Sequence, residues 1–220
     1  MNDTSSAVAS HALRHHFADM EQQRDSATLG MWVFLITEIM FFGGLFCAYL
    51  VYRTAHPLAW QEGGKHMSFG LGTANTVILL CSSFTVALSV WAAQQGRTKL
   101  TALLLVLTLL MGFAFLGVKA TEYYQHYEEG AVPGQFWHLN VPDQQNVQMF
   151  FLLYFIMTGL HALHVTIGLG VLAVIAWFAW RGHYTAEYHN PVHVAGLYWH
   201  FVDIVWIFLY PLLYLIGQAK

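Results

Sequence analysis

Ionisable side chains lie inside long apolar stretches of this sequence, where each one must have a specific chemical or structural reason to be present. His200 and Asp203 lie in the apolar stretch 197–215, three residues apart and therefore on one face of a helix. A charged side chain at the centre of a bilayer costs about 2.5–3.5 kcal/mol, so such residues face a protein interior and find partners there. Together with Trp199 and Trp206, they predict a helix face packed against other helices.

Two more histidines, His161 and His164, are also three residues apart in an apolar stretch, and this spacing predicts a shared helix face. Such a pair could ligate a metal ion or a haem iron, but metal sites need three or four converging ligands. Only His200 and His193 could contribute from elsewhere in the membrane. We therefore predict no metal site and no cofactor site in this chain, and we favour a hydrogen-bonded bundle interior.

Glu38 is the one ionisable residue of its apolar stretch. We expect it to be protonated, or paired inside a bundle or with a lipid head group. Its functional interpretation is a proton-linked or lipid-contacting site. Its structural interpretation is a hydrogen bond to Thr37 or to a neighbouring helix.

Lys119 and Glu122 lie near the end of another apolar stretch, at positions i and i+3, where their side chains can meet on one helix face. We expect this pair to be an interfacial anchor with aromatic neighbours, and a further functional role is secondary. None of the four groups of ionisable residues predicts a catalytic site, so no catalytic residue is assigned.

The elements that must hold these groups are membrane-spanning helices. Of 220 residues, 57% are hydrophobic and only 10% are charged, whereas a soluble domain carries about 25% charged residues. A run of about 20 apolar residues crosses the hydrocarbon core as a helix. We therefore predict an all-α integral membrane bundle of five transmembrane helices over residues 28–217, after a polar cytoplasmic tail at 1–27. The predicted spans are about 29–52, 70–93, 100–123, 147–180 and 193–216.

The rest of the sequence excludes several other classes of protein. The formal charge of -3 and the lack of a basic run give no indication of nucleic-acid binding. The two cysteines, Cys47 and Cys81, are too far apart for a Cys-x-x-Cys motif and are expected to be inert core residues. Residues 53–69 are predicted to be a polar loop because they contain Pro and Gly between charged residues.

Five spans place the two ends of the chain on opposite sides of the membrane, and the positive residues near the span ends set the orientation. One side receives Arg14, Arg24, Arg97, Lys99 and Arg181. The other side receives Arg53, Lys65 and Lys220, with Lys119 close to its end. This difference favours a cytoplasmic N-terminus and a periplasmic C-terminus.

Five blocks of the sequence, in order, resemble the cytochrome c oxidase subunit III family over about residues 25–217. The last block, Gly-Leu-Tyr-Trp-His-Phe-Val-Asp-Ile-Val-Trp-Ile-Phe-Leu-Tyr at 196–210, is similar to the signature of that family. Gly-Leu-His-Ala-Leu-His-Val-Thr-Ile-Gly at 159–168 resembles its paired-histidine helix, and Thr-Glu-Ile-Met-Phe-Phe at 37–42 resembles its glutamate helix. Residues 75–83 and 120–124 match two further segments.

The resemblance implies a non-catalytic subunit III of a bacterial proton-pumping haem–copper terminal oxidase in the inner (cytoplasmic) membrane. Such a subunit binds no haem or copper, which belong to partner subunits. It packs mainly on subunit I, with other oxidase subunits including subunit II as further partners, and it supports the stability and proton uptake of subunit I. Family members also hold structural phospholipid in a cleft between two helix groups, which implies lipid contacts at Glu38 and, by its position after the fourth span, at Arg181.

Two departures from the family pattern bear on this interpretation. The fuller family pattern has seven spans, and its two N-terminal helices are missing here, so the lipid cleft must be completed by another subunit or be reduced. In addition, His193 stands where mitochondrial relatives have a glutamate. The first alternative is the equivalent subunit of a quinol oxidase or a nitric oxide reductase. The second is a proton-coupled transporter that uses Glu38 and Asp203, although no inverted repeat or Pro/Gly-broken helix pair supports it.

Overall fold

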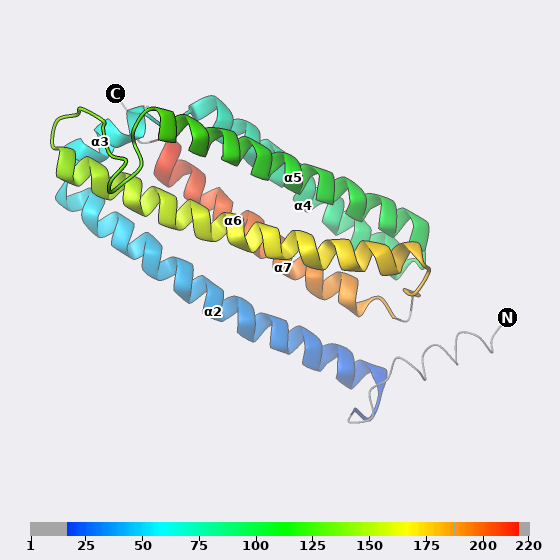
Figure 1. Cartoon of the computed structure of the whole chain (residues 1–220). Coiled ribbons are helices and arrows are strands. Elements are labelled where there is room, and N and C mark those ends of the chain that lie inside the picture. The colour runs from blue at the N-terminus through cyan, green and yellow to red at the C-terminus, as the bar shows by residue number, and fades with distance from the viewer. Residues whose placement is uncertain (1–16, 187, 216–220) are drawn as a thin grey trace.

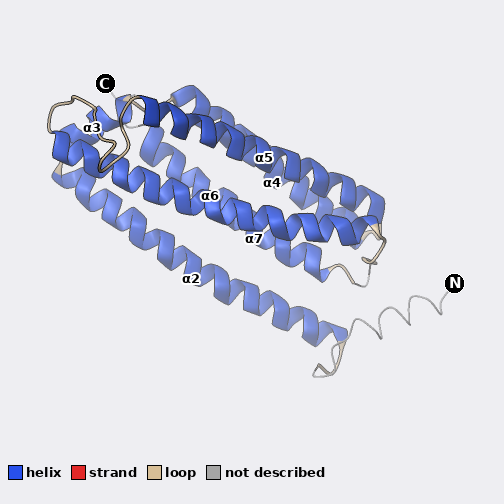
Figure 2. Ribbon diagram, in the orientation of Figure 1, coloured by secondary structure: helices blue, strands red, loops and turns tan. Residues whose placement is uncertain are grey.

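The computed structural model describes residues 17–186 and 188–215, and its regular elements are helices (Figure 1, Figure 2). They are α2 (Met20–Ala55), α3 (Pro57–Lys65), α4 (Phe69–Gln94), α5 (Thr98–Glu128), α6 (Gln144–Trp180) and α7 (Asn190–Tyr214). Five helices of this described part, α2 and α4 to α7, are long and apolar enough to cross a membrane. The predicted fold class and number of spans are therefore confirmed, and the chain is a multi-pass membrane protein.

The first long helix begins earlier than the first predicted span. Asp19 caps α2, because its carboxylate accepts a hydrogen bond at 2.7 Å from the backbone N–H of Gln22 and so satisfies one free donor of the first turn. The helix therefore starts at Met20, inside the stretch that we predicted as a polar tail (1–27). Residues 1–16 of that tail lie outside the described residues.

The predicted polar loop at 53–69 was wrong in one respect, because it contains the short helix α3. Pro57 stands in the first turn, where a missing N–H costs nothing. Trp60 is fully buried, with its ring 5.8 Å from that of Phe150 on α6. A Cβ at Gly63 would overlap the same Phe150 ring, so the glycine allows α3 to lie directly on α6.

Four helices form the body of the bundle, in the cyclic order α4, α5, α6, α7, with α7 also next to α4 (Figure 1). The helix α2 lies outside this ring, against α6 and α7. Burial reflects this arrangement. In an apolar 18-residue stretch of each helix, 61% of α7 is buried inside the molecule but only 17% of α2. The helix with His200 and Asp203 is therefore the most enclosed of the five spans.

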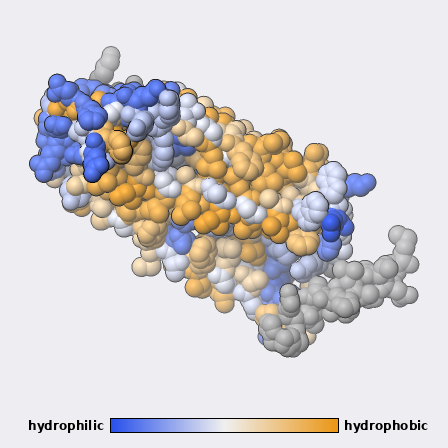
Figure 3. Space-filling view, viewed as in Figure 1, coloured by the Kyte–Doolittle hydropathy of each residue, from blue (hydrophilic) through white to orange (hydrophobic). Residues whose placement is uncertain are grey.

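The visible outer surface has the pattern of a membrane protein. Apolar side chains cover the length of the bundle and polar side chains gather at its two ends (Figure 3). Leu110 and Phe84, for example, are 62% and 63% exposed and belong to this apolar belt along the bundle. The prediction that Cys47 and Cys81 are core residues was wrong, because both thiols are exposed on this surface. Apolar neighbours in the sequence indicate lipid exposure as readily as core burial.

Candidate functional site

The most enclosed ionic group of the described chain lies between α5, α6 and α7, and we call it the lysine cluster: Lys119, Glu122, Tyr154, Tyr214 and His126. The Lys119 ammonium donates hydrogen bonds to Glu122 Oε2 at 2.8 Å, Tyr214 Oη at 2.9 Å and Tyr154 Oη at 3.1 Å. The Tyr214 hydroxyl in turn donates to Glu122 Oε2 at 2.9 Å. The charged pair therefore links three helices.

Aromatic rings complete the surroundings of the ammonium. The Lys119 Nζ lies within 5.0–5.6 Å of the ring centroids of Tyr154, Tyr123, Trp206 and Tyr214. A cation on desolvated ring faces gains about 2 kcal/mol or more. Hydrogen bonds and rings together thus offset much of the cost of burying the charge.

The carboxylate end of the lysine cluster continues toward the end of the bundle. Glu122 Oε1 lies 4.0 Å from His126 Nε2, and His126 Nδ1 lies 3.6 Å from Glu129 Oε2. The segment after α5 folds over this end, where His138 N donates to Gly130 O at 2.8 Å. A cap of loop residues therefore lies beyond the cluster.

The lysine cluster differs from the interfacial anchor that we expected. Lys119 and Glu122 do meet at i and i+3, but their side chains are only 4% and 0% exposed. Their partners Tyr154 and Tyr214 are far away in the sequence, so the spacing alone could not identify them. The signal that could have found the cluster is His126, which continues the same face one turn later.

A second pair joins α2 to α6. Glu38 Oε2 lies 3.1 Å from His164 Nε2, with the two side chains 20% and 13% exposed. Of the two structural alternatives for Glu38, the neighbouring helix is the one observed, because the Thr37 hydroxyl donates instead to the carbonyl of Phe34. Phe42 covers the imidazole, with ring centroids 5.2 Å apart.

The two hydrogen bonds of His164 indicate where its hydrogens lie. His164 Nδ1 lies 2.8 Å from the carbonyl oxygen of Leu160, and a carbonyl can only accept, so Nδ1 carries a hydrogen. The contact between His164 Nε2 and Glu38 then needs one proton between them. The pair is either a neutral acid facing a neutral imidazole or a carboxylate facing an imidazolium. In both forms it holds one shared proton at membrane depth.

The other histidine of the same helix faces a different way. His161 is 1% exposed, and its ring lies 5.2 Å from that of Trp206 on α7 and 5.6 Å from that of Phe115 on α5. The expected common face of His161 and His164 therefore does not bring the two imidazoles to one site. Within the described residues, no three His, Cys, Asp or Glu side chains converge in a way that could hold a metal ion.

The predicted packing face of α7 lies against α4. The Trp199 indole donates to Ser82 Oγ at 3.0 Å, and His200 Nδ1 lies 2.7 Å from Ser83 Oγ. Asp203 is 3% exposed between Trp199 and Trp206, which are both fully buried. The α4–α7 contact thus pairs hydroxyl side chains of one helix with ring nitrogens of the other.

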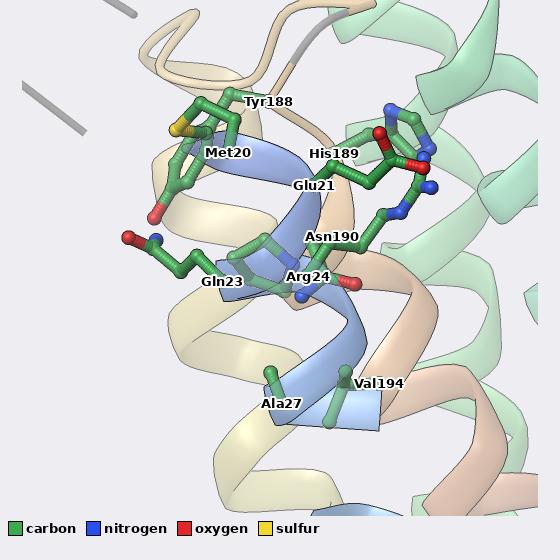
Figure 4. A pocket seen from close by; sticks show the side chains of 10 residues that line it. Met20, Glu21, Gln23, Arg24, Ala27, Tyr188, His189, Asn190 and Val194 are labelled. Atoms are coloured by element: carbon green, nitrogen blue, oxygen red, sulfur yellow. The ribbon is translucent and has the colours of Figure 1, made fainter. Parts of the chain in front are cut away.

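The end of the bundle where α2 begins carries the arginines of interest for lipid. Arg181 follows α6, and its guanidinium lies 4.5 Å from the centre of the Trp177 ring. A separate hollow of about 550 Å³ lies between the first turns of α2 and α7, where Arg24, His189 and Asn190 are among the lining residues (Figure 4). Both places offer polar groups at the end of an apolar belt.

Comparison with known proteins shows which family this chain resembles. The family model described as Cytochrome c oxidase subunit III matches residues 8–218. Cytochrome c oxidase subunit 3 of Thermostichus vulcanus is 36% identical over 195 residues, which are 88% of this chain and 89% of that protein. The subunit of the same name from Synechocystis sp. is 34% identical over 193 residues, 87% of this chain and 76% of that protein. Quinol oxidase subunit 3 of Bacillus subtilis is 32% identical over 206 residues, 91% of this chain and 93% of that protein.

Proposed function

Because the chain belongs to the cytochrome c oxidase subunit III family, we propose that it is a non-catalytic subunit of a bacterial proton-pumping haem–copper terminal oxidase. The observation that carries the proposal is the family match over residues 8–218, nearly the whole chain. Its haem and copper would belong to partner subunits. Subunit I would be the main contact, with subunit II among the further partners.

The shared proton of Glu38 and His164 supports a proton-linked role. The two groups lie 3.1 Å apart at membrane depth, and this contact requires one proton between His164 Nε2 and Glu38. Each side chain is partly exposed, at 20% and 13%, so a partner subunit packed on this surface would contact the pair directly. We assign to this pair a supporting role in proton uptake by subunit I.

The lysine cluster supports a structural role for the subunit. Three helices converge on the Lys119 ammonium and the Glu122 carboxylate, which are both enclosed. A well-bonded buried pair fixes the arrangement of the helices that supply its partners. A rigid α5–α6–α7 unit is what a subunit that stabilises a larger neighbour needs.

Structural phospholipid is part of the proposal. Glu38 is partly exposed at the depth of the acyl chains, and Arg181 lies at the end of α6, where a head group would lie. An arginine at the edge of an apolar belt suits a lipid phosphate. The hollow near Arg24 provides a second polar place at the same end of the bundle (Figure 4).

The orientation of the chain follows from its positive residues. In the described part, one end of the bundle carries Arg24, Arg97, Lys99 and Arg181, and the other carries Arg53 and Lys65. By the positive-inside rule, this difference supports a cytoplasmic beginning of α2 and a periplasmic end of α7. The membrane would be the bacterial inner membrane.

A quinol oxidase is the second candidate complex, favoured by one observation. Quinol oxidase subunit 3 of Bacillus subtilis aligns with 91% of this chain. Affinity purification from the native membrane through a tag on this chain separates the two candidates and tests the proposal. We expect haem-containing subunits to co-purify and to reduce oxygen with cytochrome c as the donor. Oxygen reduction with quinol alone would select the second candidate, and a chain that purifies without haem-bearing partners would refute both.

The role of the Glu38–His164 pair is tested in the same preparation. Glu38→Gln removes the ionisable carboxyl but keeps a hydrogen-bonding side chain. We expect the initial rate of oxygen reduction to stay within about twofold of wild type and the proton uptake during sustained turnover to fall. Loss of haem or copper from the purified complex would contradict a supporting role.

A further inference from the structure

Two hollows on the outer surface of α7 meet at the same two residues, Leu197 and His200. The first lies between α2 and α7 and has a volume of about 330 Å³. The second lies between α4 and α7 and has a volume of about 350 Å³. We call the surface formed by these two hollows the α7 outer face. We propose that it is the docking surface for a transmembrane helix of a partner oxidase subunit, an inference that rests on the proposed function.

The feature that points to a protein partner is the imidazole ring of His200. Its Nδ1 is bonded to Ser83 Oγ at 2.7 Å, while the ring lines both hollows. Its Nε2 has no hydrogen-bonding partner among residues 17–186 and 188–215 and is not enclosed. Among the same residues, the unpartnered side-chain atoms of Asn75, His161 and Asp203 are enclosed in the bundle, whereas His200 Nε2 is open to a group outside the chain. One polar atom at membrane depth therefore points to a partner outside the chain.

The depth of His200 decides between lipid and protein. It lies ten residues from Asn190 and fourteen from Tyr214, the two ends of α7, which is about 15 Å and about 21 Å along the helix axis. The hydrocarbon core is about 30 Å thick, so the imidazole lies near its centre. Head groups do not reach that depth, and acyl chains have no hydrogen-bonding groups. A side chain or backbone carbonyl of another protein is what can bond there.

The surroundings of His200 fit a helix as the partner. The hollow beside α2 has apolar walls, with Trp32, Ile39 and Phe208 among them, and can take bulky side chains. The hollow beside α4 adds Gln94 and His193 toward the end where α7 begins. A spanning helix would thus meet apolar hollows and the His200 nitrogen inside the bilayer, and polar groups at its end. Association of membrane helices relies on this combination of close packing and hydrogen bonds.

Photocrosslinking in the assembled complex tests the proposal directly. A benzophenone amino acid replaces Leu197, which lines both hollows, and the membranes are irradiated before solubilisation. The control carries the same group in place of Leu110 on α5, which is 62% exposed. We expect position 197 to crosslink to another oxidase subunit. Crosslinking of position 197 to lipid alone, in a complex that still co-purifies, would refute the docking surface and leave the proposed function standing.

Two substitutions separate docking from internal packing. Ser83→Ala and His200→Phe both remove the bond between α4 and α7, but only His200→Phe also removes Nε2. We expect His200→Phe to speed the loss of this chain from the purified complex by about 3-fold to 20-fold, the range for one hydrogen bond between membrane helices, and Ser83→Ala to speed it less. Both isolated variants should melt at similar temperatures. Equal loss rates for the two variants would overturn the proposal.

Discussion

Removing the positive charge from the lysine cluster should destabilise the chain more than removing the whole charged pair. In Lys119→Met, the Glu122 carboxylate keeps its hydrogen bond from Tyr214 but loses the ammonium at 2.8 Å, while its side chain remains 0% exposed. Breaking a buried pair by removing one partner costs about 3–5 kcal/mol. We expect a loss of this size in the free energy of unfolding.

The double variant Lys119→Met plus Glu122→Met should recover part of this loss. No unpaired charge remains in it, and an apolar replacement of a buried pair is often neutral or stabilising. The hydroxyls of Tyr154 and Tyr214 still lose a partner, at about 0.5–1.5 kcal/mol each. The expected total is therefore about 1–3 kcal/mol below wild type, and the double variant should be more stable than Lys119→Met.

The assay is unfolding of the isolated chain by a denaturing detergent in mixed micelles, with the helical signal followed for the wild type, both single variants and the double variant. The four unfolding free energies form a double-mutant cycle, which isolates the interaction between the two residues. A loss below about 1 kcal/mol for Lys119→Met would refute the reasoning. So would a double variant less stable than either single variant.

Three further predictions concern packing and exposure. Gly112→Val should cost about 1–3 kcal/mol of stability, because a Cβ at Gly112 would lie 2.5 Å from the nearest side-chain atom of α6. Gly117→Ala, whose Cβ would have nothing within 4 Å, should instead raise stability by up to about 1 kcal/mol, because alanine favours a helix interior more than glycine does. Equal unfolding free energies for the two variants would contradict this. Thr85→Val removes the 2.8 Å bond to Thr108 between α4 and α5 and should cost about 0.6 kcal/mol, and a loss above about 2 kcal/mol in the same assay would mean that the bond does more than join two helices. Both cysteines of the isolated chain in detergent should react with a small maleimide without prior unfolding, because their side chains are exposed, and protection measured by mass spectrometry would count against the surface described.

The parts of the fold that the sequence predicts are those set by local composition. Five long apolar runs predict five spans, because backbone groups in lipid must be bonded within a helix. The buried face of α7 with Trp199, Asp203 and Trp206 was predictable for the same reason, since the Asp203 carboxyl could not face lipid. The helix α3 was missed because Gly63 and Gly64 disfavour a helix, while its stability comes from Trp60 packing on α6.

The parts of the candidate site that the sequence does not predict depend on contacts between distant segments. The partners of Lys119 lie 35 and 95 residues away, on α6 and α7. The pairing of Glu38 with His164 joins residues 126 apart. Spacing places residues on a helix face, but it does not say which other helix that face meets, so burial and partner choice required the tertiary structure.

The central claim is that the polar groups of this chain join helices and hold protons but carry no electrons. Its most direct test is to release this chain from the purified oxidase complex with detergent, separate the two fractions, and record the optical spectrum and metal content of each. The account predicts that the haem absorbance and the copper remain with the other subunits. Haem or copper that leaves with this chain would contradict it.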